Sequence, residues 1–207
     1  RVIFTPSEAE AGGIGVADYA FDIDNSELDK ITAGVLQIGI NTTDSHDGVI
    51  DQYLGDIFVD GVTSAATDNI EELRIISRNG VDSQVTFENT DSTFGNHMSV
   101  EANDDINVDV NFTALDGFKL EADIDFSGVG ANIIGTGLTM GAGSDGVLLI
   151  GEDLILDGSI NSTGDVDIAS SNAIDIGVGT GIEAYTYQIS NEELQRITGD
   201  NLTIGDV

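Results

Sequence analysis

The chain contains no cysteine and no tryptophan, and Pro6 is its single proline. Without cysteine, disulfide bridges and thiolate metal sites are excluded, while the redox environment of the protein stays open. Apolar runs are short: Val147–Ile150 is among the longest, so the sequence predicts no membrane-spanning helix. No signal peptide is visible and the chain starts at Arg1, which is typical of a mature form or an excised fragment.

Basic residues are also scarce, with 6 Lys and Arg against 38 Asp and Glu and a formal net charge of −32. Such a chain repels nucleic-acid phosphates and anionic membrane surfaces, which excludes nucleic acid as a partner. Two interpretations of the charge stay open: a solvated acidic surface suited to a saline exterior, or calcium bound between strand turns. Disorder is disfavoured because hydrophobic residues make up 40% of the chain and recur regularly.

One stretch of the sequence occurs twice. Ile23–Thr32 returns as Ile189–Thr198, and Leu36–Gly39 returns as Leu202–Gly205, with equivalent residues 166 positions apart and no gap. The match extends upstream through four further pairs, Gly15 with Gly181, Val16 with Ile182, Tyr19 with Tyr185, and Phe21 with Tyr187. So many matches in one alignment indicate a repeat of the sequence.

Each copy of this stretch carries the signals of a short helix. Asp24 and Glu27 have the spacing of a capping box, and so do Ser190 and Glu193 in the second copy. A helix of one or two turns is not stable alone. We therefore expect each one to be held against a larger structure, such as the side of a stack of strands.

The duplication also predicts how the chain is organised. Residues 1–12 are expected to end a preceding segment, residues 13–178 to form one full repeat, and residues 179–207 to start the next. A chain that starts and ends with the same stretch can continue into a polymer. Two forms stay open: a covalent tandem chain, or separate subunits joined head to tail.

A five-residue phrase, apolar-x-apolar-x-small, is the second repeated pattern. Its period of two predicts strands with one buried face. Three copies start at Met98, Phe118 and Leu138, twenty residues apart, and others start at Leu36, Ile57, Leu73 and Val166. We predict an all-β fold, a parallel β-solenoid of about 20 residues per coil, with a short capped helix at each repeat boundary. A sandwich of antiparallel hairpins is the alternative, but it does not explain the twenty-residue spacing.

Two of these phrases carry a resemblance to a known family. Met98–Asp109, followed by Phe118–Asp125, resembles the coils of filamentous-haemagglutinin-type proteins, large secreted adhesins exported by two-partner or autotransporter routes. Glu27–Gly39 is similar to a phrase that recurs in their long repetitive members. The resemblance implies a right-handed parallel β-helix fibre on a bacterial exterior, with host-cell or matrix carbohydrate or protein as a partner. It implies no catalytic residues.

Three aspartates are candidate metal ligands. Asp105, Asp125 and Asp145 share the twenty-residue spacing, so we expect them to form a column on successive coils. Stacked carboxylates repel one another unless a cation lies between them, and calcium prefers such oxygen ligands. The alternative is that all three are simply solvated. His46 and His97 lie far apart in a chain without cysteine, which argues against a zinc site.

We predict a structural protein with no enzyme activity, a subunit or tandem repeat of a secreted fibre or adhesin that associates with copies of itself. One alternative is a calcium-binding surface-layer or matrix repeat module. Another is a β-helical enzyme that degrades polysaccharides with paired carboxylates, which rests on analogy between folds alone. Arg74 and Arg78 are almost the only cations available to stabilise its developing carbanion. No nucleophile elbow or phosphate-binding loop is present in the sequence.

Overall fold

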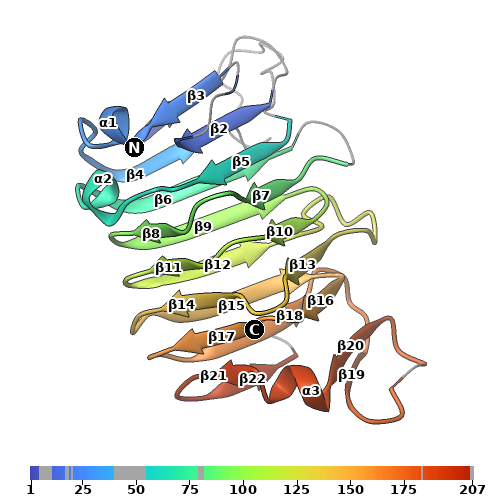
Figure 1. Cartoon of the computed structure of the whole chain (residues 1–207). Helices are drawn as coiled ribbons and strands as arrows, with labels where there is room; N and C mark the ends of the chain where they lie inside the picture. The colour runs from blue at the N-terminus through green and yellow to red at the C-terminus, as the bar shows by residue number, and fades with distance from the viewer. Residues whose placement is uncertain are drawn as a thin grey trace.

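The computed structural model describes residues 1–4, 11–16, 19, 21–39, 55–78, 82–182 and 184–205. Its strands form three large sheets, all of whose strand pairs are parallel, and one two-stranded sheet (Figure 1). We name the eight-stranded sheet A, the seven-stranded sheet B and the five-stranded sheet C. The protein is therefore all-β with parallel sheets, as the sequence predicted, and this arrangement is compatible with a parallel β-solenoid.

Each sheet draws its strands from widely separated parts of the chain. In spatial order, sheet A contains β1 (Val2–Phe4), β4 (Ala33–Ile38), β6 (Ile70–Ser77), β9 (His97–Ala102), β12 (Gly117–Glu121), β15 (Gly146–Gly151), β18 (Val166–Ser170) and β22 (Leu202–Ile204). Sheet B contains β16 (Asp153–Leu156), β13 (Ala131–Ile134), β10 (Ile106–Val108), β7 (Val85–Phe87), β5 (Ile57–Asp60), β2 (Gly12–Gly15) and β3 (Phe21–Asp24). Sheet C contains β21 (Ile197–Thr198), β17 (Ser159–Ser162), β14 (Thr139–Ala142), β11 (Phe112–Ala114) and β8 (Ser92–Phe94).

The remaining elements are one strand pair and three short helices. The strands are β19 (Ile176–Gly179) and β20 (Tyr187–Ser190), and the helices are α1 (Asn25–Leu28), α2 (Ser64–Thr67) and α3 (Asn191–Leu194). No helix in the described part of the chain is long and apolar enough to cross a membrane.

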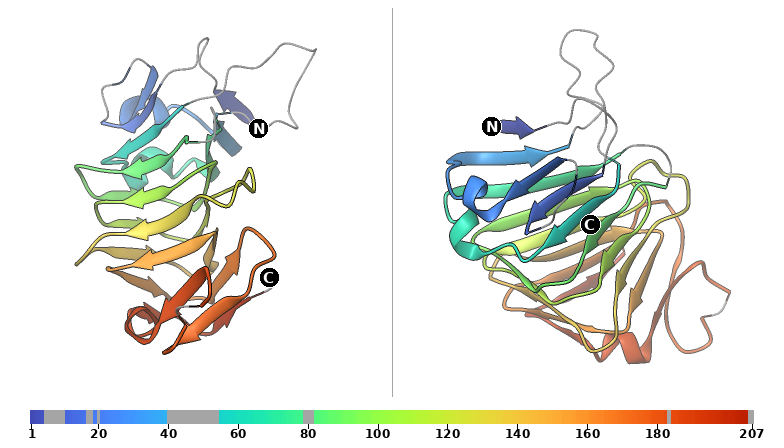
Figure 2. Two further views of the ribbon diagram at one scale, coloured as in Figure 1. Left: turned by 90° about the vertical axis from the view of Figure 1, so that its right-hand side faces the viewer. Right: turned by 45° about the horizontal axis from the view of Figure 1, so that its top comes forward.

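From β6 to β18 the chain visits sheets A, B and C in turn, so the three sheets form the walls of one stack (Figures 1 and 2). Each strand pairs with the strand that follows it by one circuit. In sheet A, for example, Phe118 lies between Met98 on one side and Val147 on the other. Backbone hydrogen bonding thus joins successive circuits along the whole stack.

The predicted twenty-residue spacing holds for only part of the stack. Met98 and Phe118 are paired in sheet A, but the next partner is Val147, 29 residues on. Leu138 instead directly precedes β14 of sheet C. Six of the nine additional residues lie in the connection from β12 to β13, which spans residues 122–130, against residues 103–105 for that from β9 to β10.

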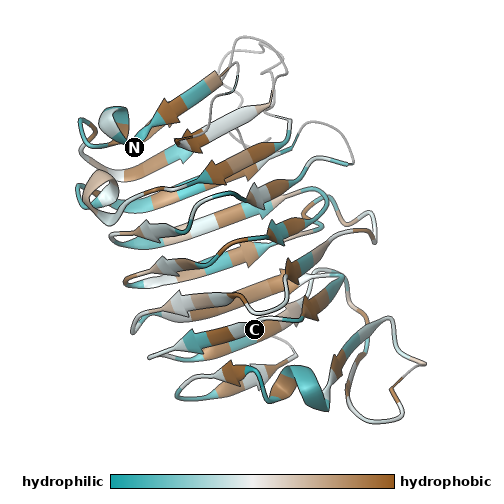
Figure 3. Ribbon diagram, viewed as in Figure 1, coloured by the Kyte–Doolittle hydropathy of each residue, from teal (hydrophilic) through white to brown (hydrophobic). Residues whose placement is uncertain are grey.

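The hydrophobic core fills the space between the three sheets. Alternate side chains of each strand point inward, which the banding of apolar and polar residues in Figure 3 follows. Phe87 of sheet B and Phe112 of sheet C stack with their ring centroids 4.7 Å apart. Phe118 of sheet A meets Phe112 edge-on at 4.9 Å, so aromatic packing joins all three walls.

Sheet B has an additional strand near its end. In sheet B, β2 lies between β3 and β5. In sheet A at the same level, β4 pairs directly with β6 and no strand lies between them. The helices α1 and α2 are direct neighbours and occupy the positions that strands fill in sheet C further along (Figure 1). The Asn25 side chain connects them, since it accepts a hydrogen bond from the Thr63 N–H at 3.1 Å and donates one to the Gly61 carbonyl at 2.9 Å.

The core predicts a sharp contrast between two leucines. Leu120 is fully buried in sheet A, whereas the side chain of Leu115 is 53% exposed. We expect Leu120→Ala to lower the free energy of unfolding by about 2–5 kcal/mol, because it leaves a cavity in the core. Leu115→Ala is the matched control and should cost less than about 1 kcal/mol. Urea unfolding followed by circular dichroism measures both, and equal losses would contradict the proposed core.

Candidate functional site: the repeated boundary coil

The described stretches within residues 2–39 and 166–205 contain the same series of elements, and we call each of them a boundary coil. In the N-terminal boundary coil the series is β1, β2, β3, α1 and β4. In the C-terminal boundary coil it is β18, β19, β20, α3 and β22, with the two-residue strand β21 between α3 and β22. The second and third strands of each series pair in parallel, and so do the first and last. One local fold therefore occurs twice in the chain.

The two copies align with one shift that the sequence comparison missed. From β3 and β20 onward, equivalent residues are 166 apart, since Phe21 matches Tyr187. In the preceding strands, however, Gly15 pairs with Asp24 just as Gly179 pairs with Ser190. The structural equivalent of Gly15 is therefore Gly179, not Gly181, and both have a φ of +102°. The turn between β19 and β20 is two residues longer than its counterpart.

Each boundary coil contains a helix held by reciprocal hydrogen bonds. The Glu27 N–H donates to Asp24 Oδ1 at 2.8 Å, and the Asp24 N–H donates to Glu27 Oε2 at 3.1 Å. Ser190 and Glu193 make the same pair of bonds, at 3.2 and 2.8 Å. These bonds satisfy backbone donors that a one-turn helix leaves free, and so help to stabilise a helix that is too short to persist alone.

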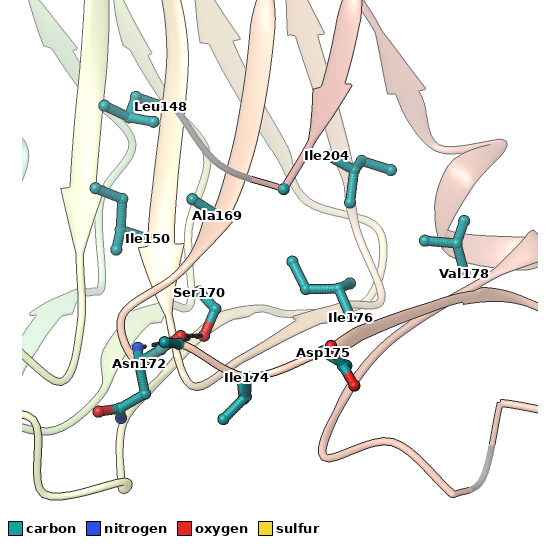
Figure 4. Close-up of a pocket in the computed structure, with 12 residues that line it drawn as sticks. Leu148, Ile150, Ala169, Ser170, Asn172, Ile174, Asp175, Ile176, Val178 and Ile204 are labelled. Carbon is teal, nitrogen blue, oxygen red and sulfur yellow. Dashed lines mark hydrogen bonds between the residues drawn. The ribbon is translucent and has the colours of Figure 1, made fainter.

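The C-terminal boundary coil borders a cavity of about 570 Å³ (Figure 4). Residues of β15, β18, β19 and β22 line it, including Leu148, Ile150, Ala169, Ile176, Val178 and Ile204. Most of the lining residues are apolar, Ser170 and Asn172 add polar groups, and Asp175 is the single carboxylate. With one carboxylate and no histidine or basic residue, the lining does not gather the groups that acid–base chemistry needs.

The three predicted calcium ligands do not share one column. Asp105 directly precedes β10 of sheet B, and its neighbour on the next circuit is Ala131, whose N–H donates to Asp105 Oδ1 at 2.8 Å. Asp145 directly precedes β15 of sheet A and lies next to Asp116. Asp125 belongs to the connection between β12 and β13, where it accepts a hydrogen bond from the Ser127 N–H. The longer circuit after Phe118 separates the residues that equal spacing had suggested would align.

Within the described residues, no group of three or more His, Asp or Glu is placed to hold a metal ion. His97 lies on β9, and His46 falls outside the described part of the chain. Calcium binding stays a prediction of the sequence.

The arginines suggested for the enzyme alternative both form ion pairs. Arg74 Nε lies 2.6 Å from Glu72 Oε1, and Arg78 Nη2 lies 3.0 Å from Glu101 Oε2. The second pair is largely buried, with 17% of the Arg78 side chain and 14% of the Glu101 side chain exposed. Both arginines therefore help to neutralise carboxylates on sheet A.

A polar cluster around Asp123 was not found by sequence reasoning. Asp123 is fully buried and has a φ of +55°. Its carboxylate accepts four hydrogen bonds, from Ser127 Oγ, the Gly128 N–H, Ser171 Oγ and Asn172 Nδ2, at 2.6–3.1 Å. The cluster ties the long connection after β12 to the turn after β18. The two turns are 48 residues apart in the sequence, so their contact has no local sequence signal. Only Ser127–Gly128, in the connection after β12, indicates a turn from the sequence alone.

Comparison with known proteins found no relative: no family model matches the chain, and neither the curated proteins nor the solved structures contain a significant match. The function must therefore be inferred from the chain itself.

Tyr187 of β20 supplies a test of the boundary coil. Its hydroxyl is buried and has no hydrogen-bond partner among the described residues. Burial, followed by the charges of Asp153 and Glu193, raises the pKa of this hydroxyl. Phe21 occupies the equivalent place in the N-terminal boundary coil, so the fold does not need the oxygen atom.

We expect Tyr187→Phe to raise the free energy of unfolding by about 1 kcal/mol, because it removes a buried donor without a partner. Tyr185→Phe is the control and should have no effect, since Tyr185 is 42% exposed. Thermal and urea unfolding measure both variants. A loss of stability in Tyr187→Phe would show that the hydroxyl is bonded, for example to water.

Asp105 predicts a pH dependence of stability. Its burial raises the pKa of the carboxyl, partly offset by the hydrogen bond from the Ala131 N–H, and the charge of Asp104 raises it further. The folded chain therefore binds this proton more tightly than the unfolded chain, in which the pKa is near the ordinary value of 3.8. The free energy of unfolding should fall as the pH rises from 3.8 through the raised pKa of the folded state.

Asp105→Asn should flatten this dependence, because the amide is neutral throughout yet its oxygen can still accept the bond. Asp24 provides a control of opposite sign, since hydrogen bonds from Ser26 and the Glu27 N–H lower the pKa of its carboxyl. The lowered pKa of Asp24 contributes stability that is present above pH 3.8 and is lost as the pH falls through the pKa of the folded state. Asp24→Asn should remove this contribution. Urea midpoints measured between about pH 3 and about pH 7 check both slopes. An unchanged slope in Asp105→Asn would contradict the assignment.

Proposed function

We propose that the protein is a length of structural rod in an extracellular fibre or adhesin stalk on a bacterial surface. The rod is a parallel β-solenoid whose coils take 19–29 residues between β6 and β18, with a capped helix marking each repeat boundary. Its activity is mechanical: it spans distance and resists unfolding, and it performs no reaction. Further copies of the repeat are its partners along the fibre axis.

The single observation that carries this proposal is the presence of the same boundary coil at both ends of one stack. β1 and β22 are the two edge strands of sheet A, and they belong to the two copies. Between them the sheet is continuous and covers one hydrophobic core. The duplication supports the proposal that the stretch between the two copies is one period of a fibre, because the elements that follow the first copy could also follow the second.

The charge of the chain supports an exterior location. The chain carries a net charge of −32, and some of its Asp side chains accept hydrogen bonds from the backbone between strands, as where the Asn111 N–H donates to Asp91 Oδ1 at 3.1 Å. A highly charged surface keeps a long β structure soluble and discourages pairing between the sides of neighbouring rods. The resemblance to filamentous-haemagglutinin-type proteins agrees with this location and suggests host-cell or matrix carbohydrate or protein as the adhesion target.

The proposal is tested on cells that produce the protein. Gold-labelled antibodies against the chain should mark thin fibres on intact cells in electron micrographs. The labelled material, released and run on a denaturing gel, should give a band far above 21.6 kDa, the mass of this chain. Antibodies absorbed with the pure protein serve as the control. Label confined to the cell interior, on compact particles, would overturn the proposed function.

A further inference from the structure

We infer that the C-terminal boundary coil is a docking surface for residues 55–77 of a second copy of this chain, and that neighbouring copies share one boundary coil. This inference rests on the proposed function, and it names the contacts by which one period is joined to the next. Its basis is a difference between the two boundary coils in what each one touches.

Apolar side chains that are covered in the first copy are open in the second. Ile14 is fully buried where β2 pairs with β5, but its equivalent Val178 is 45% exposed. Leu36 is fully buried where β4 pairs with Leu73 of β6, but its equivalent Leu202 is 42% exposed. What covers the first copy is therefore the circuit β5–α2–β6. The second copy presents the same apolar positions without that circuit.

The glycines of the two copies show the same contrast. A Cβ atom added to Gly39 would collide with the carbonyl oxygen of Ile76, so this position allows β6 to approach closely. Gly205 is the equivalent residue and also has a positive φ, +126°, yet nothing lies within 4 Å of the corresponding point. The C-terminal boundary coil thus retains room for a strand that no described residue occupies.

An asparagine provides the polar part of the surface. In the first copy, Asn25 bonds through both side-chain atoms to the turn before α2, at the Gly61 carbonyl and the Thr63 N–H. Asn191 stands at the equivalent position of α3 and is exposed. Its side chain has no hydrogen-bond partner in the described part of the chain. Of the side chains with both donor and acceptor, an amide is well suited to bind a carbonyl and an N–H together.

These contacts decide between the two forms of polymer. Residues 55–77 of a free second copy are already covered by that copy's own N-terminal boundary coil. An intact copy therefore cannot dock on the surface just described unless it gives up that coil. The conflict disappears when one boundary coil serves both periods, as it does when the periods are tandem repeats of one polypeptide. Asp206, which follows Gly205 in the sequence, then stands at the position equivalent to Ile40.

The experiment compares two fused chains. In the shared chain, residues 1–205 are followed by residues 40–207, so one boundary coil lies between the periods. In the unshared chain, residues 1–207 are followed by residues 1–207, so each period keeps its own coils. Hydrogen exchange should slow on the order of tenfold or more at Leu202–Ile204 of the first period in the shared chain, relative to the single chain. The unshared chain should show no such protection.

Asn191→Ala tests the contact itself. In the single chain, Asn25→Ala should lower the urea midpoint, and Asn191→Ala should leave it unchanged. In the shared chain, Asn191→Ala should also lower the midpoint, or speed exchange at Leu202–Ile204 of the first period. Equal protection in both fusions, a neutral Asn191→Ala in the shared chain, or a shared chain that fails to fold while the unshared chain folds would overturn the inference. Labelled fibres on cells together with any of these results would leave the proposed function intact and remove only the shared coil.

Discussion

Hydrogen bonding between each strand and its equivalent one circuit later is the interaction on which this architecture depends. It places residues of the same kind in columns, because in-register parallel pairing stacks each inward-facing side chain on the inward-facing side chain of the next strand. One inward column of sheet A consists of Ile38, Ile75, Val100, Leu120, Leu149, Ile168 and Ile204. A slip of one residue would turn this whole column toward water, so the register and the core stabilise each other.

The boundary coil differs from the rest of the stack in how it is stabilised. One-turn helices replace strands there, and such helices gain little from propensity. Their stability comes from the reciprocal bonds of Asp24 with Glu27 and of Ser190 with Glu193, and in the first copy from contact with α2. These features are encoded within a few residues, which explains why the boundary is the clearest signal in an otherwise loosely repetitive sequence.

The all-β class and the duplicated stretch could be predicted because both rest on local patterns. Alternation within five residues identifies a strand, but it does not tell which sheet the strand joins. The phrase at Leu138 was therefore placed in the same column as Met98 and Phe118, although it lies in sheet C. The expected column of Asp105, Asp125 and Asp145 failed for the same reason, since the long connection after β12 shifts every later residue.

Other features depend on contacts that sequence spacing cannot show. The Asp123 cluster joins two turns far apart in the chain, and its Ser and Asn donors are common in any turn. The sequence comparison did not find Gly179 as the structural equivalent of Gly15. The turn after β19 has two additional residues, which an alignment without gaps cannot accommodate. The contrast between Leu36 and Leu202 is visible only as burial, because their sequences are alike.

The additional strand of sheet B has a geometric consequence for a long array. Strands are spaced by about 4.8 Å, so β3 and β5, with β2 between them, are separated by about 9.6 Å. Neighbouring helices such as α1 and α2 need about 8–10 Å between their axes, which matches that wider spacing. On the third side, β4 and β6 are adjacent and separated by only about 4.8 Å. The N-terminal boundary coil is therefore thicker on the side of sheet B than on the side of sheet A. In the fibre proposed above, this difference would bend the axis and place sheet A on the concave side.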